Sequence, residues 1–367
     1  MLAVWALGAA LAAPAQAGSR PIEGSYIVVV KPGESPESVA REAGASPRYV
    51  YRSALNGFAA ELNDRQVAGL ERNPRVEYVE QDQVGTAVAT QSMDAYGDPW
   101  GLDRIDQRGL PLSGTYTYAA TASAIRAYVI DTGIATSHTE FGGRASNVYD
   151  AFGGNGQDCN GHGTHVAGTV GAVKYGVAKA SKLRGVRVLD CAGGGSYSGI
   201  IAGVDWVRKN HIKPAVANMS LGGGYSSSLN TATANLSSAG VFVAVAAGNE
   251  NQDACNVSPA STAAAYTTAA SDKTDTRASF SNYGSCVDAY APGVGIKSTW
   301  LSGGTNKISG TSMASPHVAG IGALYKATYG DASSSTVGSW ITNNATGSVI
   351  RSNVAGTPNR LVYKAGL

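Results

Sequence analysis

The sequence predicts an α/β fold with a mainly parallel sheet, preceded by a small α+β segment. Two observations support this prediction. From about Trp100 onward, buried strand-like runs alternate with helical stretches, which is typical of a parallel sheet covered on both faces. Residues 21–82 instead follow the order β-α-β-β-α-β, the split βαβ (ferredoxin-like) arrangement.

The N-terminal residues resemble a secretion signal. Residues 2–13 form an apolar run that is short for a membrane span, and Ala15-Gln16-Ala17 follows with the small-x-small pattern cut by signal peptidase. We therefore expect a signal peptide over residues 1–17. No Lys or Arg precedes the run, and the alternative is an uncleaved anchor.

Residues 21–82 have their own succession of short predicted strands and helices. Residues 83–98, which follow this small segment, are small and polar without periodicity, so we expect a linker and a processing site there. The segment carries no residue that looks catalytic. Its predicted elements are a strand at 26–31, a helix from Pro36, a strand pair within 49–62 broken by the turn Asn56-Gly57, a helix capped by Asn63 through about Leu70, and a strand at 76–80.

The larger segment supplies the candidate site. In parallel sheets, reactive groups gather at the carboxyl ends of strands. Asp131 directly follows one apolar run and Asn249 follows another, so both lie where a site is expected. The predicted strands are 127–130, 185–189, 215–219 and 241–247, and the predicted helices are roughly 162–174, 198–210, 227–239 and 312–328.

Net charge and cysteine content limit the classes of partner and the cellular compartment that we expect. A formal net charge of +2, with 15% charged residues, gives no indication of a nucleic-acid or anionic-membrane partner. Four cysteines, an even number, fit an oxidising compartment, and the sequence alone allows three pairings.

Four motifs carry the chemistry: VIDTG with Asp131, GHGTHVAG with His162, AAGNE with Asn249 and SGTSMASPHVAG with Ser312. A serine hydroxyl becomes a nucleophile when a histidine removes its proton, and a carboxylate holds that imidazole in the required tautomer. The order Asp, His, Ser differs from the orders of α/β-hydrolases and of chymotrypsin and is the order in subtilisin.

Each motif also has a simpler interpretation. Asp131 and Asn249 could be turn residues, His165 is a rival base, and Ser309 or Ser315 could be an ordinary helix cap. A different class of site is also open, because Cys159, His162, His165 and Cys191 could offer two thiolates and two imidazoles to zinc.

Together the motifs resemble the subtilase superfamily, specifically its proteinase K branch and most closely the aqualysin-type enzymes. The resemblance extends from the small segment to the C-terminus and implies a three-layer subtilisin-like domain. It implies that Asp131 orients His162, that His162 is general base and then acid, and that Ser312 attacks the scissile carbonyl. Asn249 matches the oxyanion residue of the family.

The resemblance also implies a substrate groove, bordered on one side by Gly195, Ser196 and Tyr197 and on the other by Ser220, Leu221 and Gly222. Ala246, Ala247 and Gly248 would form the floor of the main specificity pocket. No charged residue occupies these stretches, so we expect a broad preference for apolar and aromatic side chains.

Structural calcium and disulfides are implied in the same way. One Ca²⁺ site maps onto the carbonyls of Ala263 and Ala265 and the carboxylate of Asp288, and a second onto Asp103, Asp106 and Gln107. Chain order and resemblance together favour the disulfides Cys159–Cys191 and Cys255–Cys286.

These inferences predict a secreted, monomeric serine endopeptidase made as a preproenzyme. Residues 18–88 would be the inhibitory propeptide, residues 89–367 the peptidase domain, and self-cleavage would fall near Val88-Ala89. After processing we expect protein substrates, with neither nucleic acid nor membrane as a partner. The alternatives are a permanent accessory domain in place of the propeptide, a catalytically silent peptide-binding relative, and a lipid esterase.

Overall fold

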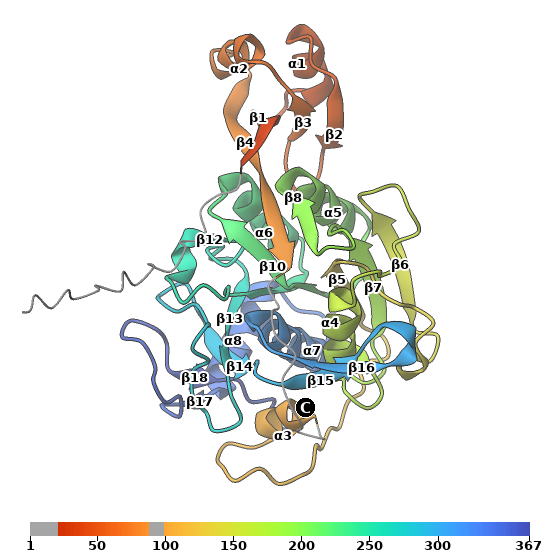
Figure 1. Cartoon of the computed structure of the whole chain (residues 1–367), viewed down its shortest axis with the longest axis vertical. Helices are drawn as coiled ribbons and strands as arrows, with labels where there is room; N and C mark the ends of the chain where they lie inside the picture. The colour runs from red at the N-terminus through yellow and green to blue at the C-terminus, as the bar shows by residue number, and fades with distance from the viewer. Residues whose placement is uncertain (1–20, 88–98) are drawn as a thin grey trace, which may run out of the picture.

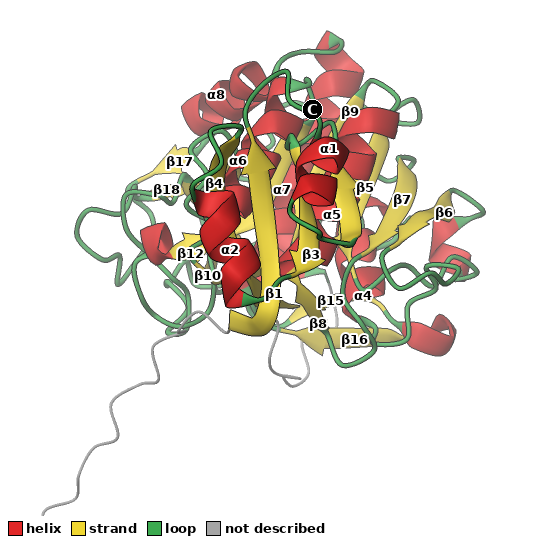
Figure 2. Ribbon diagram, turned by 90° about the horizontal axis from the view of Figure 1, so that it is seen from above, coloured by secondary structure: helices red, strands yellow, loops and turns green. Residues whose placement is uncertain are grey.

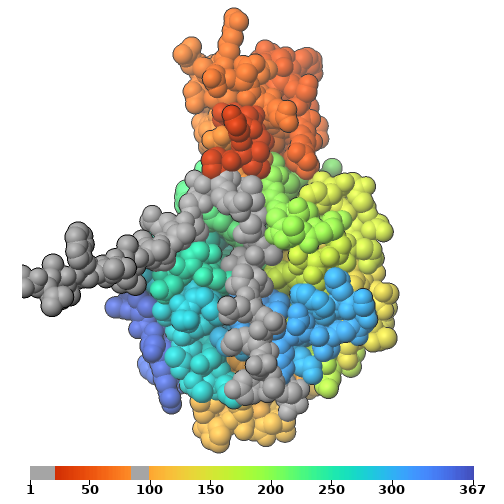
Figure 3. Space-filling view, in the orientation of Figure 1, coloured from red at the N-terminus to blue at the C-terminus, as the bar shows by residue number. Residues whose placement is uncertain are grey.

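A computed structural model describes residues 21–87 and 99–367 (Figure 1). Residues 21–87 form a small domain that protrudes from one end of a larger body, as Figure 3 shows. The predicted signal peptide and the predicted cleavage at Val88-Ala89 lie outside the described residues.

The small domain has the predicted β-α-β-β-α-β order. The strand order β4-β1-β3-β2 gives an antiparallel sheet with both helices on one face (Figure 2). Asn63 caps α2 through a capping box with Gln66. The elements are β1 (Pro21–Val30), α1 (Pro36–Glu42), β2 (Pro47–Tyr51), β3 (Gly57–Glu61), α2 (Asp64–Glu71) and β4 (Val76–Ala87).

The two faces of this small sheet have different partners. Val28, Val30 and Phe58 pack under α1 and α2. Ile27 and Val29, on the opposite face, belong to a cluster that includes the helices of the larger body. The alternation of side chains along β1 therefore joins the small domain to the large one.

The larger body is built on a mainly parallel sheet of order β17-β18-β14-β13-β11-β9-β5-β7-β6. Successive strand residues face opposite layers: Val129 packs with α4 and α7, whereas Tyr128 and Ile130 pack with α5 and α6. Its strands are β5 (Arg126–Asp131), β6 (Ala145–Asp150), β7 (Lys182–Arg187), β9 (Ala215–Met219), β11 (Phe242–Ala246), β13 (Tyr266–Ser271), β14 (Ala289–Pro292), β17 (Thr346–Gly347) and β18 (Arg360–Leu361).

Four helices of the larger body lie close to their predicted positions, and its first and last helices were not predicted. The α-helices are α3 (Trp100–Asp106), α4 (His162–Gly171), α5 (Tyr197–Asn210), α6 (Ser227–Ser238), α7 (Thr311–Tyr329) and α8 (Ser334–Asn344). Short strands complete the body: β8 (Gly194–Ser196), β10 (Leu221–Gly224), β12 (Val257–Ser258), β15 (Ile296–Thr299) and β16 (Thr305–Ile308).

One prediction was wrong. Residues 83–87 are not linker, because β4 continues to Ala87 and its far end pairs with β8 and β10 of the larger body. Small polar residues without periodicity form a strand here because backbone groups on both sides pair with them.

Candidate active site

Two of the predicted catalytic side chains are in direct contact. Asp131 is the last residue of β5 and His162 the first residue of α4. The Oδ1 of Asp131 lies 2.7 Å from the Nδ1 of His162, and both residues are buried. Within the described part of the chain, the Nε2 of His162 is buried without a hydrogen-bond partner, so it is the ring atom available for proton transfer.

The electrostatics of this pair favour a protonated imidazole. Burial acts to lower the pKa of His162, but the charge and hydrogen bond of Asp131 outweigh it and raise the pKa above its usual value of 6.5, with a further contribution from Asp158. The ring is therefore a stronger base than an isolated imidazole and stabilises the proton that it receives.

Ser312 is the second residue of α7, a helix that packs against α4. Its Oγ donates to the carbonyl of Ser220 at 3.2 Å, and the Oγ of Ser220 donates to the carbonyl of Ser312 at 2.8 Å. Ser220 directly follows β9, and β9 lies beside β5 in the sheet. Ser312 is thereby held at the sheet edge where Asp131 ends its strand.

Asn249 lies next to the same helix start. Its Oδ1 accepts hydrogen bonds of 2.9 Å from both the backbone N–H and the Oγ1 of Thr311. Because the oxygen of the amide is used in this way, its NH₂ group faces away from Thr311. A donor beside the N-terminus of α7 has the character needed to hold a developing oxyanion.

A groove between β8 and β10 contains the end of β4. Gly85 pairs with Gly195, and Val84 with Ser196, on one side. On the other side, Thr86 pairs with Gly222 and Ala87 with Leu221. Figure 1 shows β4 entering between these strands. Four of the predicted groove residues therefore bind an extended chain through their backbone, as in β-strand addition.

Tyr197 lies at the base of this wall rather than along it. It is the first residue of α5, is buried, and donates from its hydroxyl to the carbonyl of Gly224 at 2.8 Å. Burial also raises its pKa. The hydroxyl thus links α5 to the end of β10.

The predicted pocket floor begins with Ala246, the last residue of β11. Ala246 and Ala247 are buried, and Gly248 has φ = 102°, a backbone conformation that favours glycine. A Cβ at Gly248 would lie 2.2 Å from the Nδ2 of Asn282 and 2.7 Å from the Oε2 of Glu250. The carboxylate of Glu250, which sequence reasoning did not include, accepts from Asn282 at 2.8 Å.

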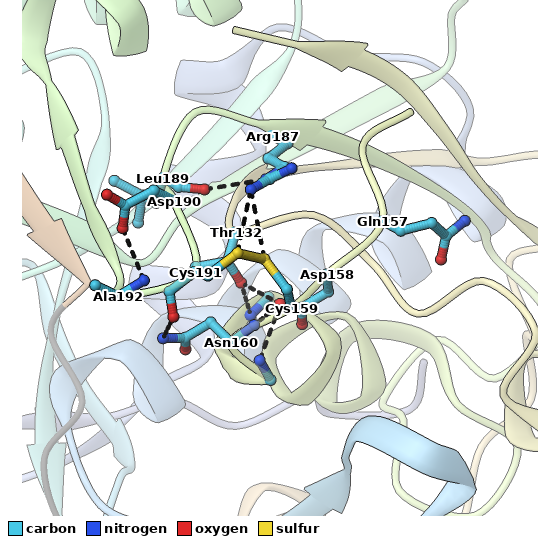
Figure 4. Close-up of a disulfide and its surroundings, with 12 residues drawn as sticks. Thr132, Gln157, Asp158, Cys159, Asn160, Arg187, Leu189, Asp190, Cys191 and Ala192 are labelled. Carbon is cyan, nitrogen blue, oxygen red and sulfur yellow. Dashed lines mark hydrogen bonds between the residues drawn. A yellow bond between two sulfur atoms is a disulfide. The ribbon is translucent and has the colours of Figure 1, made fainter. Parts of the chain in front are cut away.

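Two disulfides have the favoured pairing. Cys159 is bonded to Cys191 and Cys255 to Cys286, with Cα–Cα distances of 5.0 and 5.3 Å. Figure 4 shows the first one beside the turn that leads into α4. Because Cys159 and Cys191 are bonded to each other, they cannot act as the thiolate ligands of the alternative zinc site.

The rival polar residues have structural partners. His165 is buried with its Nε2 2.9 Å from the carbonyl of Ile296, and burial lowers its pKa to about 3. Ser309 accepts from the backbone N–H of Gly295, and Ser315 donates to Asn218. Within residues 21–87 and 99–367, no hydrogen bond joins any of these three side chains to Asp131 or His162.

The first predicted calcium set contains one carboxylate, that of Asp288, on which the charge of Arg360 acts only as the smallest influence on the pKa. Asp288 accepts from the backbone N–H of Thr267 at 2.7 Å, and burial raises its pKa to about 6. Carboxylate and carbonyl oxygens are the donors that suit calcium. Its two predicted carbonyls, those of Ala263 and Ala265, lie just ahead of β13, in which Thr267 is the second residue.

The second predicted calcium set is already engaged. Asp103 and Gln107 both accept from the backbone N–H of Ser113, at 3.1 and 2.9 Å. The carboxylate of Asp106 lies 2.9 Å from the Nζ of Lys364. Lys364 neutralises part of the negative charge that would attract calcium. The second calcium site therefore stays a prediction. Within residues 21–87 and 99–367, no group of three or more His, Cys, Asp or Glu side chains is arranged to hold a metal.

Across the described ranges no helix has the length and apolar character of a membrane span. Residues 125–363 match the subtilase family, and residues 25–87 match the peptidase inhibitor I9 family. The second match identifies the small domain as a prosegment of the inhibitor type.

The chain is similar to solved and sequenced proteinases over most of its length. It is 56% identical over 324 residues to an extracellular serine proteinase of Thermus sp. (strain Rt41A), across 87% of this chain and 78% of that one. It is 45% identical over 351 residues to proteinase R of Parengyodontium album, across 93% and 89%. The crystal structure of a cold adapted subtilisin-like serine proteinase matches with a TM-score of 0.72 and 48% identity, across 74% of this chain and 100% of that chain. The predicted family and fold are confirmed: the chain belongs to the subtilase family of serine proteinases.

Proposed function

We propose that the chain is a secreted, self-processed endopeptidase that cleaves proteins through an acyl-enzyme, with Ser312 as nucleophile, His162 as base and acid, and Asp131 as the orienting carboxylate. The observation that carries this proposal is the 2.7 Å contact between Asp131 and the Nδ1 of His162, which leaves Nε2 for the reaction. The homologous proteinases place the protein outside the cell, consistent with its predicted signal peptide.

In the first half of the reaction the same proton is transferred twice, first to His162 and then to the leaving amine. As the Ser312 oxygen bonds to the scissile carbonyl carbon, its proton passes to the Nε2 of His162. The imidazolium, stabilised by ionised Asp131, then gives the proton to the leaving amine as the C–N bond breaks. A water molecule hydrolyses the ester by the same steps, which restores the serine hydroxyl and releases the new carboxyl end.

The oxyanion that forms during each attack would be held by the side-chain NH₂ of Asn249 and the backbone N–H of Ser312. The fixed bonds from Thr311 to Asn249 support this role, because they orient the amide before substrate arrives. A preorganised donor of this kind contributes roughly 3–4 kcal/mol to transition-state stabilisation.

Substrate would bind in the groove that β4 now fills, with Gly195, Ser196 and Tyr197 on one side and Ser220, Leu221 and Gly222 on the other. The alanine and glycine floor at Ala246, Ala247 and Gly248 supports a preference for apolar and aromatic side chains. Because β4 pairs with both walls, the prosegment would inhibit by taking the place of a substrate strand. Residues 18–88 would be this propeptide and residues 89–367 the mature, monomeric enzyme.

Calcium would stabilise the mature domain at Asp288 with the carbonyls of Ala263 and Ala265. The residues fit the ion because they offer a half-buried carboxylate and two carbonyl oxygens, and oxygen is the donor that calcium prefers. When bound, the ion would supply positive charge and cross-linking to the loop before β13. It takes no part in the peptide cleavage.

A fluorophosphonate probe tests the function directly. The mature enzyme should gain the mass of one probe less hydrogen fluoride at Ser312, because fluoride leaves as the Ser312 oxygen bonds to phosphorus, and casein should be hydrolysed whereas long-chain esters are not. Ser312→Ala should lose both the labelling by the probe and the hydrolysis of casein. A wild-type protein that stays unlabelled would support the catalytically silent alternative, and hydrolysis of long-chain esters alone would support a lipid esterase.

A further inference from the structure

Asp158 is a buried carboxylate that the proposed reaction does not use. It lies four residues before His162 and is 8% exposed. Its Oδ1 accepts hydrogen bonds of 2.9 Å each from the Oγ1 of Thr132 and the backbone N–H groups of Asn160 and Gly161. Its Oδ2 accepts from the backbone N–H and the Oγ1 of Thr164, at 2.9 and 2.6 Å. Figure 4 shows Asp158 beside Thr132 and Asn160.

These donors lie on both sides of the catalytic histidine. Asn160 and Gly161 precede His162, and Thr164 follows it in the first turn of α4. The cap of this helix is Gly161, which has no side chain to accept from the free N–H groups. Asp158 supplies the missing acceptor, and its negative charge suits a helix N-terminus.

Thr132 extends the same network to the other member of the pair. Its Oγ1 donates to Asp158 and accepts from the backbone N–H of Gly163 at 2.9 Å. Its own backbone N–H donates to the Oδ1 of Asp131 at 2.7 Å. The hydroxyl of Thr132 therefore joins the end of β5 to the start of α4.

Close packing reinforces this junction. A Cβ at Gly163 would lie 2.2 Å from the carbonyl of Gly133 and 3.0 Å from the Oγ1 of Thr132. The missing side chain is what allows α4 to approach the strand end. Hydrogen bonds and close packing thus both fix the backbone where the end of β5 meets the start of α4.

We propose that Asp158 is a positioning residue that works through Thr132 to hold His162 against Asp131. The inference rests on the proposed function and adds a residue outside its catalytic set. Losing the network would leave Asp131, His162 and Ser312 present but would let the imidazole shift from its place. Because a displacement of about 1 Å can cost on the order of 100-fold in rate, the effect should fall on kcat.

The charge of Asp158 provides a second, distinct readout. Burial lowers the pKa of His162, the Asp131 carboxylate raises it, Asp158 raises it further, and the nearby His165 is kept neutral by its own burial. Removing one of the two carboxylates should therefore lower the pKa of His162. The acid limb of the rate profile should move to lower pH, which a loss of stability alone would not produce.

The experiment compares four variants of the full-length proenzyme after maturation: Asp158→Asn, Thr132→Val, Thr132→Ser and Asp150→Asn. Asp150 is a matched control, because it is a buried carboxylate of the same region that bonds Phe152, Gly156 and Arg187 but no residue of α4. Each enzyme is assayed on a chromogenic peptide for kcat, KM and the pH profile. Melting temperature is recorded in parallel.

We expect Asp158→Asn and Thr132→Val to lower kcat by about tenfold or more with little change in KM. Only Asp158→Asn should shift the acid limb, and Thr132→Ser should recover most of the loss by restoring the hydroxyl. Asp150→Asn should keep the wild-type pH profile. A wild-type kcat and profile in Asp158→Asn would overturn the proposal, and so would an equal effect of Asp150→Asn.

Impaired maturation would also be informative. If Asp158→Asn folds with a wild-type melting temperature but fails to cleave its prosegment, it has lost its first turnover and the proposal is supported. If it does not fold, the Thr132→Val and Thr132→Ser pair decides, since both keep Asp158. Fluorophosphonate labelling of wild-type Ser312 is measured separately. If the proposed function is wrong, the wild-type enzyme stays unlabelled whatever the variants show.

Discussion

The carboxylate of Asp82 in the prosegment accepts a hydrogen bond of 2.9 Å from the backbone N–H of Ser198, in the first turn of α5. The Oγ of Ser198 also donates to this carboxylate. Two residues earlier on β4, Glu80 accepts from the backbone N–H of Ser228 at 3.0 Å, in the first turn of α6. One strand thus supplies caps for two neighbouring helices of the peptidase domain.

Removing these two caps should weaken inhibition by the prosegment. Each lost cap costs about 1 kcal/mol, so Glu80→Ala with Asp82→Ala should weaken binding roughly 30-fold. The measurement is the lag before peptidase activity appears after self-cleavage, which should shorten. Asp64→Ala, at an exposed position in α2, is the control and should leave the lag unchanged. An unaltered lag in the double variant would show that the caps do not limit release.

Local sequence was enough to predict four helices of the larger body, α4 to α7, and four strands of its main sheet, β5, β7, β9 and β11. The run AYVI, residues 127–130, predicted β5, and the start of α4 was predicted at His162. These elements carry their own pattern of apolar residues, so neighbours in sequence report them. The short distance between Asp131 and His162 follows from two such elements meeting at one sheet edge.

Pairing between distant segments could not be predicted in this way. The end of β4 is a strand only because β8 and β10 lie on its two sides. Asp158 was also missed, although an acidic residue four positions before a helical histidine offers a capping signal. Its role depends on Thr132, which lies 26 residues away and enters the network through the fold.

Replacement of Asn249 should separate the two functions of its amide. Asn249→Ala should lower kcat about 100- to 1,000-fold with little change in KM, because the oxyanion loses one donor. Asn249→Asp keeps an oxygen to accept from Thr311 but replaces the NH₂ donor with a negatively charged oxygen, so it should lose at least a similar factor. Steady-state kinetics on a peptide substrate check both values. A near-normal kcat in the Asp variant would mean that the amide acts by holding Thr311.

The two disulfides form a natural comparison, because they close loops of nearly equal length, with sequence separations of 32 and 31. Replacing either pair with serine should lower the free energy of unfolding by a similar amount, roughly 3–4 kcal/mol in the chain-entropy model. Only loss of Cys159–Cys191 should also lower kcat. Asn160 donates to the carbonyl of Cys191 at 3.1 Å and accepts from the backbone N–H of His162 at 3.2 Å.

Denaturant unfolding and kinetics on both double variants test this comparison. Each should be measured at a temperature where the variant is fully folded, so that a fall in kcat reports geometry rather than unfolding. Equal kcat values in the two variants would show that the disulfide near α4 has no special connection to the active site.

Calcium dependence should change with pH because of Asp288. Burial raises the pKa of this carboxyl to about 6, above its ordinary value of 3.8. A raised pKa means that the protonated form contributes stability below about pH 3.8, and that this contribution is lost as pH rises through about 6. Above pH 6 the half-buried carboxylate is ionised, and bound calcium would offset the cost of partly desolvating its charge.

A chelator should therefore lower the melting temperature of the mature enzyme more at pH 7.5 than at pH 5. Asp288→Asn should reduce this difference, because it removes the charge that calcium neutralises. Asp106→Asn is the matched variant for the second predicted site, where Lys364 already pairs with the carboxylate. If chelator sensitivity survived in Asp288→Asn and vanished in Asp106→Asn, calcium would be assigned to α3, and the ion at Asp288 would be rejected.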